Sequence, residues 1–277
     1  MRLTFAETMC MARNQWQDWM ASPYYVKFIQ AQSPYPSGRL YENILEHVAA
    51  AKDQRILMAG SGNGTKAAEL GASGYDITGT DYSDTLTALA LPLATDTVNF
   101  YQHDLRLPFW SNYFGFAFST ARSFGIYDTR REHENLLRTI TGSLLPGGYL
   151  LLEYINTKYL EQHPFSNEEQ DIDGTHYSII HMQDDTHFYS TITVTDPLLP
   201  SPEVYVHKKQ KFTSNDFTVL LDEQGLQVVE LFGDDDLGPY EPETAPKLII
   251  LARKTTAEKD DAEKRLYSDG RTGDALT

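Results

Sequence analysis

The chain has 277 residues, of which 41% are hydrophobic and 22% charged, a composition typical of a folded globular protein and not of a disordered one. Asp and Glu outnumber Lys and Arg by 39 to 23, which gives a formal net charge of −16 at pH 7. Nucleic acid and anionic membranes repel such a chain unless it carries a concentrated basic patch, and the sequence contains none.

Residues 51–156 alternate short apolar runs with helical ones. We expect strands at 56–59, 76–79, 98–101, 114–119 and 149–154, and helices at 65–70, 83–94 and 134–145, with Ser83 capping the second helix. Strands separated by helices must pair in parallel through crossovers, which predicts an α/β fold with a doubly wound, mostly parallel, Rossmann-like sheet. Ligands of such sheets bind beyond the carboxyl ends of the strands.

The pattern changes after residue 156. Runs at 176–182, 187–194 and 204–212 predict antiparallel strands, which we interpret as a small β insertion over 157–210. The α/β core resumes at 211–254 with a helix capped by Ser214 and strands at 226–232 and 247–253. No helix separates these two strands, so the last strand of the seven-stranded sheet should be antiparallel. We expect residues 1–50 to form a helical lid and residues 255–277 a mobile tail.

Three glycines, Gly60, Gly62 and Gly64, lie between the first strand and its helix, where they permit positive φ and let a ligand approach the main chain. Asp81 ends the second strand, where a carboxylate can bind ribose hydroxyls, and Asp104 follows the third, where it can accept from an adenine amino group. Each feature alone is common in turns, but together they predict an adenosine pocket. The spacing G-x-G-x-G differs from that of dinucleotide sites and favours a ligand without a diphosphate.

Four segments, 56–64, 79–83, 102–104 and 144–148, together resemble the class I S-adenosylmethionine-dependent methyltransferases. Within that family the chain is similar to small-molecule enzymes with a β insertion after the fifth strand. The resemblance implies S-adenosyl-L-methionine as cofactor and direct in-line transfer of its methyl group to a small-molecule acceptor. It also implies the groups that hold the cofactor, which are Gly60, Ser61 and Gly62 at the methionine part, Asp81 at the ribose, Tyr82 on the adenine, and Asp104 with Leu105 at the adenine edge.

Two further segments are expected to border the cofactor or the acceptor. After the fourth strand, where this family places substrate-facing groups, Thr120 is assigned to the cofactor and Arg122 and Tyr127 to the acceptor, although Arg122 fits a surface ion pair equally well. The aromatic N-terminal segment resembles a lid in which Tyr25 or Arg39 reaches the methionine carboxylate and Tyr24 faces the acceptor. An ordinary amphipathic helix packed on the sheet explains the same pattern.

One position departs from the family. Met58 stands where the family usually has an acidic residue, two positions before its first glycine, that helps to order the polar end of the cofactor. The departure leaves open a non-catalytic relative that binds S-adenosylmethionine or S-adenosylhomocysteine. A nicotinamide-dependent oxidoreductase is the less favoured alternative because of the glycine spacing. The sequence specifies no catalytic base and no metal ligand set.

The remaining expectations concern location and partners. Cys10 is the one cysteine, which excludes an internal disulfide and fits a reducing compartment. No signal peptide and no membrane-spanning run is visible, so we expect a cytoplasmic protein. Its partner should be a small-molecule substrate, with no nucleic acid and no membrane, and the protein should be a monomer or a homodimer.

Overall fold

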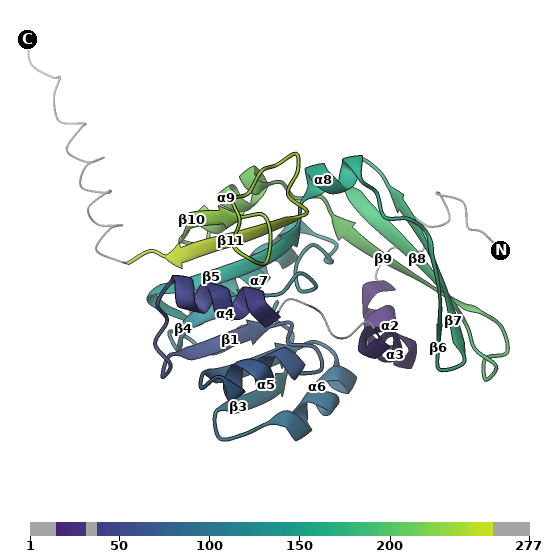
Figure 1. Cartoon of the computed structure of the whole chain (residues 1–277), viewed down its shortest axis with the longest axis horizontal. Coiled ribbons are helices and arrows are strands. Elements are labelled where there is room, and N and C mark those ends of the chain that lie inside the picture. The colour runs from purple at the N-terminus through teal and green to yellow at the C-terminus, as the bar shows by residue number, and fades with distance from the viewer. Residues whose placement is uncertain (1–14, 32–37, 257–277) are drawn as a thin grey trace, which may run out of the picture.

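A seven-stranded sheet forms the centre of the molecule in the computed structural model, which describes residues 15–31 and 38–256. The strands lie in the order β10-β11-β5-β4-β1-β2-β3 (Figure 1). Strands β1 to β5 pair in parallel, whereas β11 is antiparallel to both of its neighbours, as predicted. Their bounds are β1 Arg55–Ala59, β2 Asp76–Asp81, β3 Val98–Gln102, β4 Phe114–Ser119, β5 Leu144–Ile155, β10 Leu226–Phe232 and β11 Lys247–Lys254.

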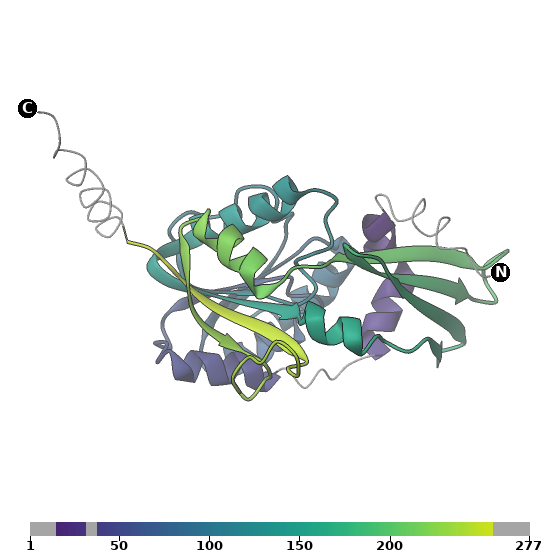
Figure 2. The same ribbon diagram turned by 90° about the horizontal axis from the view of Figure 1, so that it is seen from above.

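Helices cover both faces of this sheet (Figures 1 and 2). Because side chains alternate along a strand, Ile56 and Met58 face α4 (Gly38–His47) and α5 (Thr65–Ala72). Leu57 and Ala59 face the opposite layer, which contains α7 (Arg130–Ser143) and α9 (Ser214–Asp222). The core is thus two apolar layers, one on each side of the central strands. The fold class is confirmed as a Rossmann-like doubly wound sheet.

Side-chain caps set the ends of the helices. The Ser83 hydroxyl accepts from the amide of Leu86 at 3.2 Å, which confirms the predicted cap of α6 (Asp84–Ala90). α6 is shorter than predicted, because the chain tightens into a 3₁₀ turn, η1 (Leu91–Leu93), around Pro92. α7 begins earlier than predicted, after a capping box of Thr129 and Glu132.

Two other details of the predicted helices were wrong or missing. The cap of α9 is Thr213, which forms a capping box with Asp216, and not the predicted Ser214. A short helix, α8 (Thr157–Gln162), follows β5 and was not predicted; the Asn156 side chain accepts from the amide of Tyr159 at its start.

A second, four-stranded sheet lies to one side of the first (Figure 1). We call it the insertion sheet; its strands β6 (Glu168–Ile172), β7 (Thr175–Gln183), β8 (His187–Thr195) and β9 (Glu203–Gln210) pair antiparallel in that order. The sequence predicted β7, β8 and β9 but not β6. This edge strand is acidic and half exposed, and it forms because Asp173 and Gly174, with φ of 44° and 82°, turn the chain back onto it.

Two N-terminal helices, α2 (Gln15–Ala21) and α3 (Pro23–Ala31), lie between the insertion sheet and the seven-stranded sheet (Figures 1 and 2). An apolar cluster joins them to the insertion sheet; its buried members are Trp19, Tyr25, Val26, Leu86, Tyr177, Ile179, Ile192 and Val194. The tail predicted at 255–277 lies outside the described residues except for Thr255 and Thr256, and Cys10 lies outside them as well. Within residues 15–31 and 38–256, no helix has the length and apolar character that a bilayer crossing requires.

Candidate functional site

A cavity of about 170 Å³ lies at the carboxyl ends of β1 to β4, below α2 and α3; we call it the first cavity. This is the place where doubly wound sheets bind their ligands. Most of the residues singled out from the sequence line it: Gly60, Ser61, Gly62, Asp81, Tyr82, Asp104, Leu105, Thr120, Tyr25, Arg122 and Tyr127. The sheet therefore brings together side chains that are up to about a hundred positions apart in the chain.

The glycine loop after β1 is fixed by its own backbone. Gly60 has a φ of 78°, and a Cβ there would lie 2.8 Å from the Thr120 hydroxyl and 3.0 Å from the Cβ of Ser123. Its amide donates to the carbonyl of Thr80 at 2.8 Å, and its carbonyl accepts from Thr120 at 3.1 Å. Gly62 also has a positive φ of 59°, but its missing side chain would face open space. The loop therefore keeps main-chain atoms open to a ligand.

Asp81 lies at the end of β2, with its side chain buried between the glycine loop and α6. Oδ2 accepts from the amide of Gly62 at 2.8 Å, and Oδ1 accepts from the amide of Ser83 at 2.9 Å. Burial raises the pKa of Asp81, and these two hydrogen bonds oppose the increase. Because a carboxylate has about four acceptor positions, the carboxylate keeps roughly two for a ligand with paired hydroxyls.

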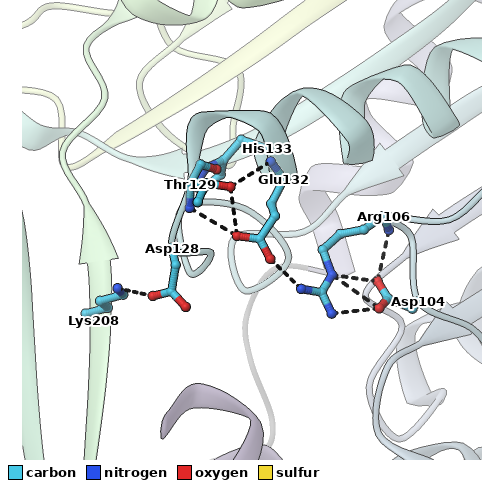
Figure 3. A network of polar contacts seen from close by, with 7 residues as sticks. All are labelled: Asp104, Arg106, Asp128, Thr129, Glu132, His133 and Lys208. Carbon is cyan, nitrogen blue, oxygen red and sulfur yellow. Dashed lines mark hydrogen bonds and ion pairs between the residues drawn. The ribbon is translucent and has the colours of Figure 1, made fainter. Parts of the chain in front are cut away.

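Asp104 has a different environment (Figure 3). Arg106 reaches both of its carboxylate oxygens, through Nη2 at 2.7 Å, through Nε at 3.0 and 3.2 Å, and through its backbone amide at 3.0 Å. Partial burial raises the pKa of Asp104, but the hydrogen bonds from Arg106 outweigh it and hold the pKa below its ordinary value. These four contacts occupy the acceptor positions of Asp104, so the predicted bond from an adenine amino group would have to displace one of them.

Arg106 also links the first cavity to α7. Its Nη1 lies 2.5 Å from Glu132, the acidic residue of the α7 capping box (Figure 3). The guanidinium lies 5.4 Å from the ring centres of both Trp16 and Tyr127. The salt bridges and the ring contacts together fix this side of the cavity as a rigid wall.

Aromatic rings form the wall beside Asp81 and Leu105. The ring of Trp16 lies 5.1 Å from that of Tyr82 and 5.6 Å, edge to face, from that of Tyr127. Trp16 was not predicted as a site residue, although its place in the aromatic N-terminal segment was the available signal. Flat apolar surface next to a buried carboxylate suits a nucleoside, so we call this part the nucleoside end of the first cavity.

The opposite part of the first cavity is ionic. It is lined by Tyr41 of α4, Lys66 and Glu69 of α5, Arg122, and Glu153 of β5, which we call the ionic end. Tyr41 donates to Glu153 Oε2 at 3.2 Å, and Lys247 Nζ lies 3.5 Å from Glu153 Oε1. Burial raises the pKa of Tyr41 well above its ordinary value and lowers the pKa of Lys66. Apart from Arg122, sequence reasoning missed this group of residues.

Three positions discussed from the sequence lie away from the first cavity. Arg39 is exposed on the first turn of α4, and the Tyr24 side chain is close to Asp196 and Glu203 of the insertion, so neither lines the cavity. Met58 is 1% exposed and packs in the core on the α4 face. Within residues 15–31 and 38–256, no group of three His, Cys, Asp or Glu side chains could hold a metal ion.

Comparisons with known proteins agree with this geometry. A family model described as a methyltransferase domain matches residues 30–231. A curated tRNA U34 carboxymethyltransferase from Cellvibrio japonicus is 29% identical over 146 residues, which are 49% of this chain and 43% of that protein. The match thus spans less than half the length of that relative.

Solved structures share the fold at low identity. An S-adenosylmethionine-dependent methyltransferase from Clostridium acetobutylicum is 13% identical, with a TM-score of 0.69 over 84% of this chain and 97% of that one. An amino pentose methyltransferase from Micromonospora echinaspora, described as bound to S-adenosylmethionine, is 16% identical, with a TM-score of 0.61 over 84% and 97%. The family model covers well over half of the residues, so the chain belongs to the methyltransferase-domain family and has the fold of its class I S-adenosylmethionine-dependent members.

Proposed function

We propose that the protein transfers a methyl group from S-adenosylmethionine to a small-molecule acceptor, with the cofactor in the first cavity. One observation carries the proposal: a single cavity joins a nucleoside end to an ionic end across the glycine loop. S-adenosylmethionine matches both ends, since it combines an adenosine with an amino-acid zwitterion. When bound, it supplies a methyl group on an activated sulfonium.

At the nucleoside end, Asp81 accepts from the two ribose hydroxyls with the acceptor positions that Gly62 and Ser83 leave open. The rings of Trp16, Tyr82 and Tyr127 pack against the adenine, and buried Leu105 adds apolar contact. The Arg106 salt bridges hold this wall in place before the cofactor arrives, which reduces the entropy lost on binding.

At the ionic end, Glu153 pairs with the ammonium of the methionine part, and Lys66 pairs with its carboxylate. Support comes from position, since both side chains line the cavity beside the glycine loop, and from charge, since Tyr41 and Lys247 hold the Glu153 carboxylate in one orientation. Glu153 on this view replaces the acidic residue that the family usually has where this chain has Met58. The charge is retained although it comes from a different strand.

The protein itself has two tasks in the transfer. It must align the acceptor's nucleophile with the methyl group, and it must exclude water from a reactive sulfonium. The loop that follows β4 is suited to the first task because Thr120 and Ala121 border the cavity and Arg122 lies at its ionic end. The helices α2 and α3, packed over the cavity, are suited to the second.

Calorimetry tests the cofactor directly. The protein should bind S-adenosylmethionine and S-adenosylhomocysteine and should not bind NAD or NADH. Glu153→Gln and Lys66→Met should each weaken binding of S-adenosylhomocysteine by about tenfold or more, which corresponds to the loss of a charge-assisted contact. Glu241→Gln, on the exposed loop before β11, is a matched control. Unchanged affinity in both cavity variants would exclude the ionic end as the binding place of the methionine part.

A tRNA acceptor is the second candidate, because the curated relative modifies tRNA by its printed name. The net charge of −16 argues against it, since binding to tRNA relies on cations that neutralise phosphates. Incubation with methyl-labelled S-adenosylmethionine and either bulk tRNA or a small-molecule extract distinguishes the two. We expect label in the small-molecule fraction; label in tRNA would make the second candidate correct.

A further inference from the structure

A second cavity, of about 280 Å³, lies where the insertion sheet meets the end of β5 and α8. Ile155 and Leu160 form its wall on the side of the seven-stranded sheet, and β7, β8 and β9 form the other wall. Phe165 lines it too and is 56% exposed, which places it at the mouth. None of these residues belongs to the proposed cofactor site.

One face of the insertion sheet supplies the polar groups of this cavity. His181, Ser190 and His207 are register partners across β7, β8 and β9, and Lys209 follows His207 two positions later on the same face. The His181 Nδ1 lies 3.0 Å from the Ser190 hydroxyl. The row continues the apolar face that packs against α2 and α3, so it lies at the joint between the two sheets.

The charge of the second cavity is opposite to that of the protein. The chain carries a net charge of −16, but no Asp or Glu of the described residues lines this cavity, whereas Lys209 does. Burial lowers the pKa of Lys209 to about 8, which leaves it mainly protonated at neutral pH. Burial lowers the pKa of His207 to about 4, so that ring is neutral. The cavity therefore favours an anion and disfavours an amine cation.

A buried polar atom in the wall lacks a protein partner. The Nε2 of His181 is buried without a hydrogen bond, and the carboxylate oxygen of Glu168 nearest to it is 3.9 Å away. Leaving such an atom unpaired costs about 1–3 kcal/mol, so a ligand group that pairs with it gains affinity. The second cavity thus offers one cation, one free ring nitrogen and apolar walls.

The two cavities share a wall. The Lys209 ammonium donates to the carbonyl of Ala121, which lines the first cavity next to Arg122. An ammonium has three donors, and that of Lys209 also lies 4.7 Å from the centre of the Tyr154 ring, so a donor not directed at Ala121 or at this ring remains for a ligand. A molecule anchored at Lys209 therefore lies next to the loop that borders the proposed methyl-donor site.

We propose that the second cavity holds the methyl acceptor and that it selects small carboxylates with an aromatic or other apolar body; this rests on the proposed function. The carboxylate binds Lys209 at the shared wall, and the apolar body packs against Ile155, Leu160 and Phe188. His181 Nε2 pairs with a further polar group of the acceptor. The same arrangement disfavours acceptors that carry a free ammonium.

The probes are benzoate, phenylacetate and hydrocinnamate, each compared with its neutral amide, titrated at millimolar concentration into ¹⁵N-labelled protein saturated with S-adenosylhomocysteine. We expect at least one carboxylate to shift His181 and Lys209 signals and to bind about tenfold or more tightly than its amide. Lys209→Met should abolish the preference. Lys208→Met is the matched control, because Lys208 lies next to it on the other face of β9 and contacts Asp128.

Two results with the native chain would overturn the carboxylate site. Equal binding of acid and amide, or no binding by any of the three acids, overturns the inference even if Lys209→Met fails to fold, because both results come from the native chain. Loss of carboxylate binding in the presence of S-adenosylhomocysteine, with binding in its absence, means that the acids occupy the first cavity and also overturns it. Failure of S-adenosylhomocysteine to bind would instead refute the proposed function.

Discussion

The two sheets build their polar sites in different ways. In the seven-stranded sheet, the first cavity is defined by backbone: Gly60 has a conformation and a set of neighbours that exclude a side chain, and main-chain amides position Asp81. In the insertion sheet, the second cavity is defined by side chains in register, His181, Ser190 and His207 on three strands. A backbone-defined site is therefore sensitive to any added atom, whereas a side-chain-defined site can change its ligand through single substitutions.

Gly60→Ala should have the largest effect, because it adds a Cβ where the Thr120 hydroxyl is 2.8 Å away and φ is positive. We expect a loss of about 3 kcal/mol in the free energy of unfolding, measured with urea, together with loss of S-adenosylhomocysteine binding. Gly174→Ala in the insertion sheet is the matched control: its φ is 82°, but nothing lies within 4 Å of the added atom. It should cost about 1 kcal/mol, and equal losses would show that the clash is irrelevant.

Asp81→Ala should weaken binding of S-adenosylhomocysteine by about 1–3 kcal/mol in calorimetry, since it removes charge-assisted hydrogen bonds. The stability loss should be smaller than the binding loss, because burial already disfavours the ionised carboxylate in the folded protein. An unchanged dissociation constant would contradict the role assigned to Asp81.

The free energy of unfolding should depend on pH in two separate ranges, one set by a histidine packed on the seven-stranded sheet and one set by a lysine of the insertion sheet. Burial lowers the pKa of His133, on the buried face of α7, to about 4 and that of Lys209 to about 8, so the folded state binds fewer protons than the unfolded state in each case. The stability contributed by neutral His133 is complete above about pH 6.5 and is lost as the pH falls toward 4; that of neutral Lys209 rises from about pH 8 to 10.5.

Urea unfolding at a series of pH values measures both effects. His133→Phe should flatten the acidic part of the stability profile, and Lys209→Met should flatten the alkaline part. A variant profile parallel to that of the native chain would mean that the corresponding group keeps its ordinary pKa in the folded protein.

The smallest effect is expected from the helix caps. Thr129→Ala breaks the capping box of α7 and should lower the free energy of unfolding by about 1 kcal/mol. Thr213→Ala breaks the same motif in α9 and should cost as much. Since Glu132 of the α7 box also binds Arg106, only Thr129→Ala should additionally weaken cofactor binding. Identical binding by the two variants would remove that link.

What the sequence predicted follows the same division. The glycine loop, Asp81 and the Ser83 cap each have a local signature, which is glycines or a carboxylate directly after a strand and a serine directly before a helix, so local patterns were sufficient to find them. Glu153 was missed because it stands in an apolar strand, and its partners Tyr41 and Lys247 come from α4 and β11. No local sequence pattern predicts that these three side chains come together.

The insertion was the harder region for related reasons. β6 could not be predicted because it has no apolar run. Its pairing with β7 depends instead on the turn at Asp173 and Gly174. The alignment of His181, Ser190 and His207 depends on strand register across two hairpins, which spacing alone does not specify. Asp104 was found by position, but its engagement with Arg106 became visible only in three dimensions.

The ring of Trp16, in contact with Tyr82 and Tyr127 on the wall of the first cavity, has a practical consequence. The fluorescence emission of an indole changes when a purine binds next to it. The emission of Trp16 should therefore change when a cofactor binds in the first cavity. Of the three tryptophans, Trp19 lies in the apolar cluster with the insertion sheet and Trp110 lies near Tyr101, so neither lines the cavity. Binding rates are therefore accessible by stopped flow without any label.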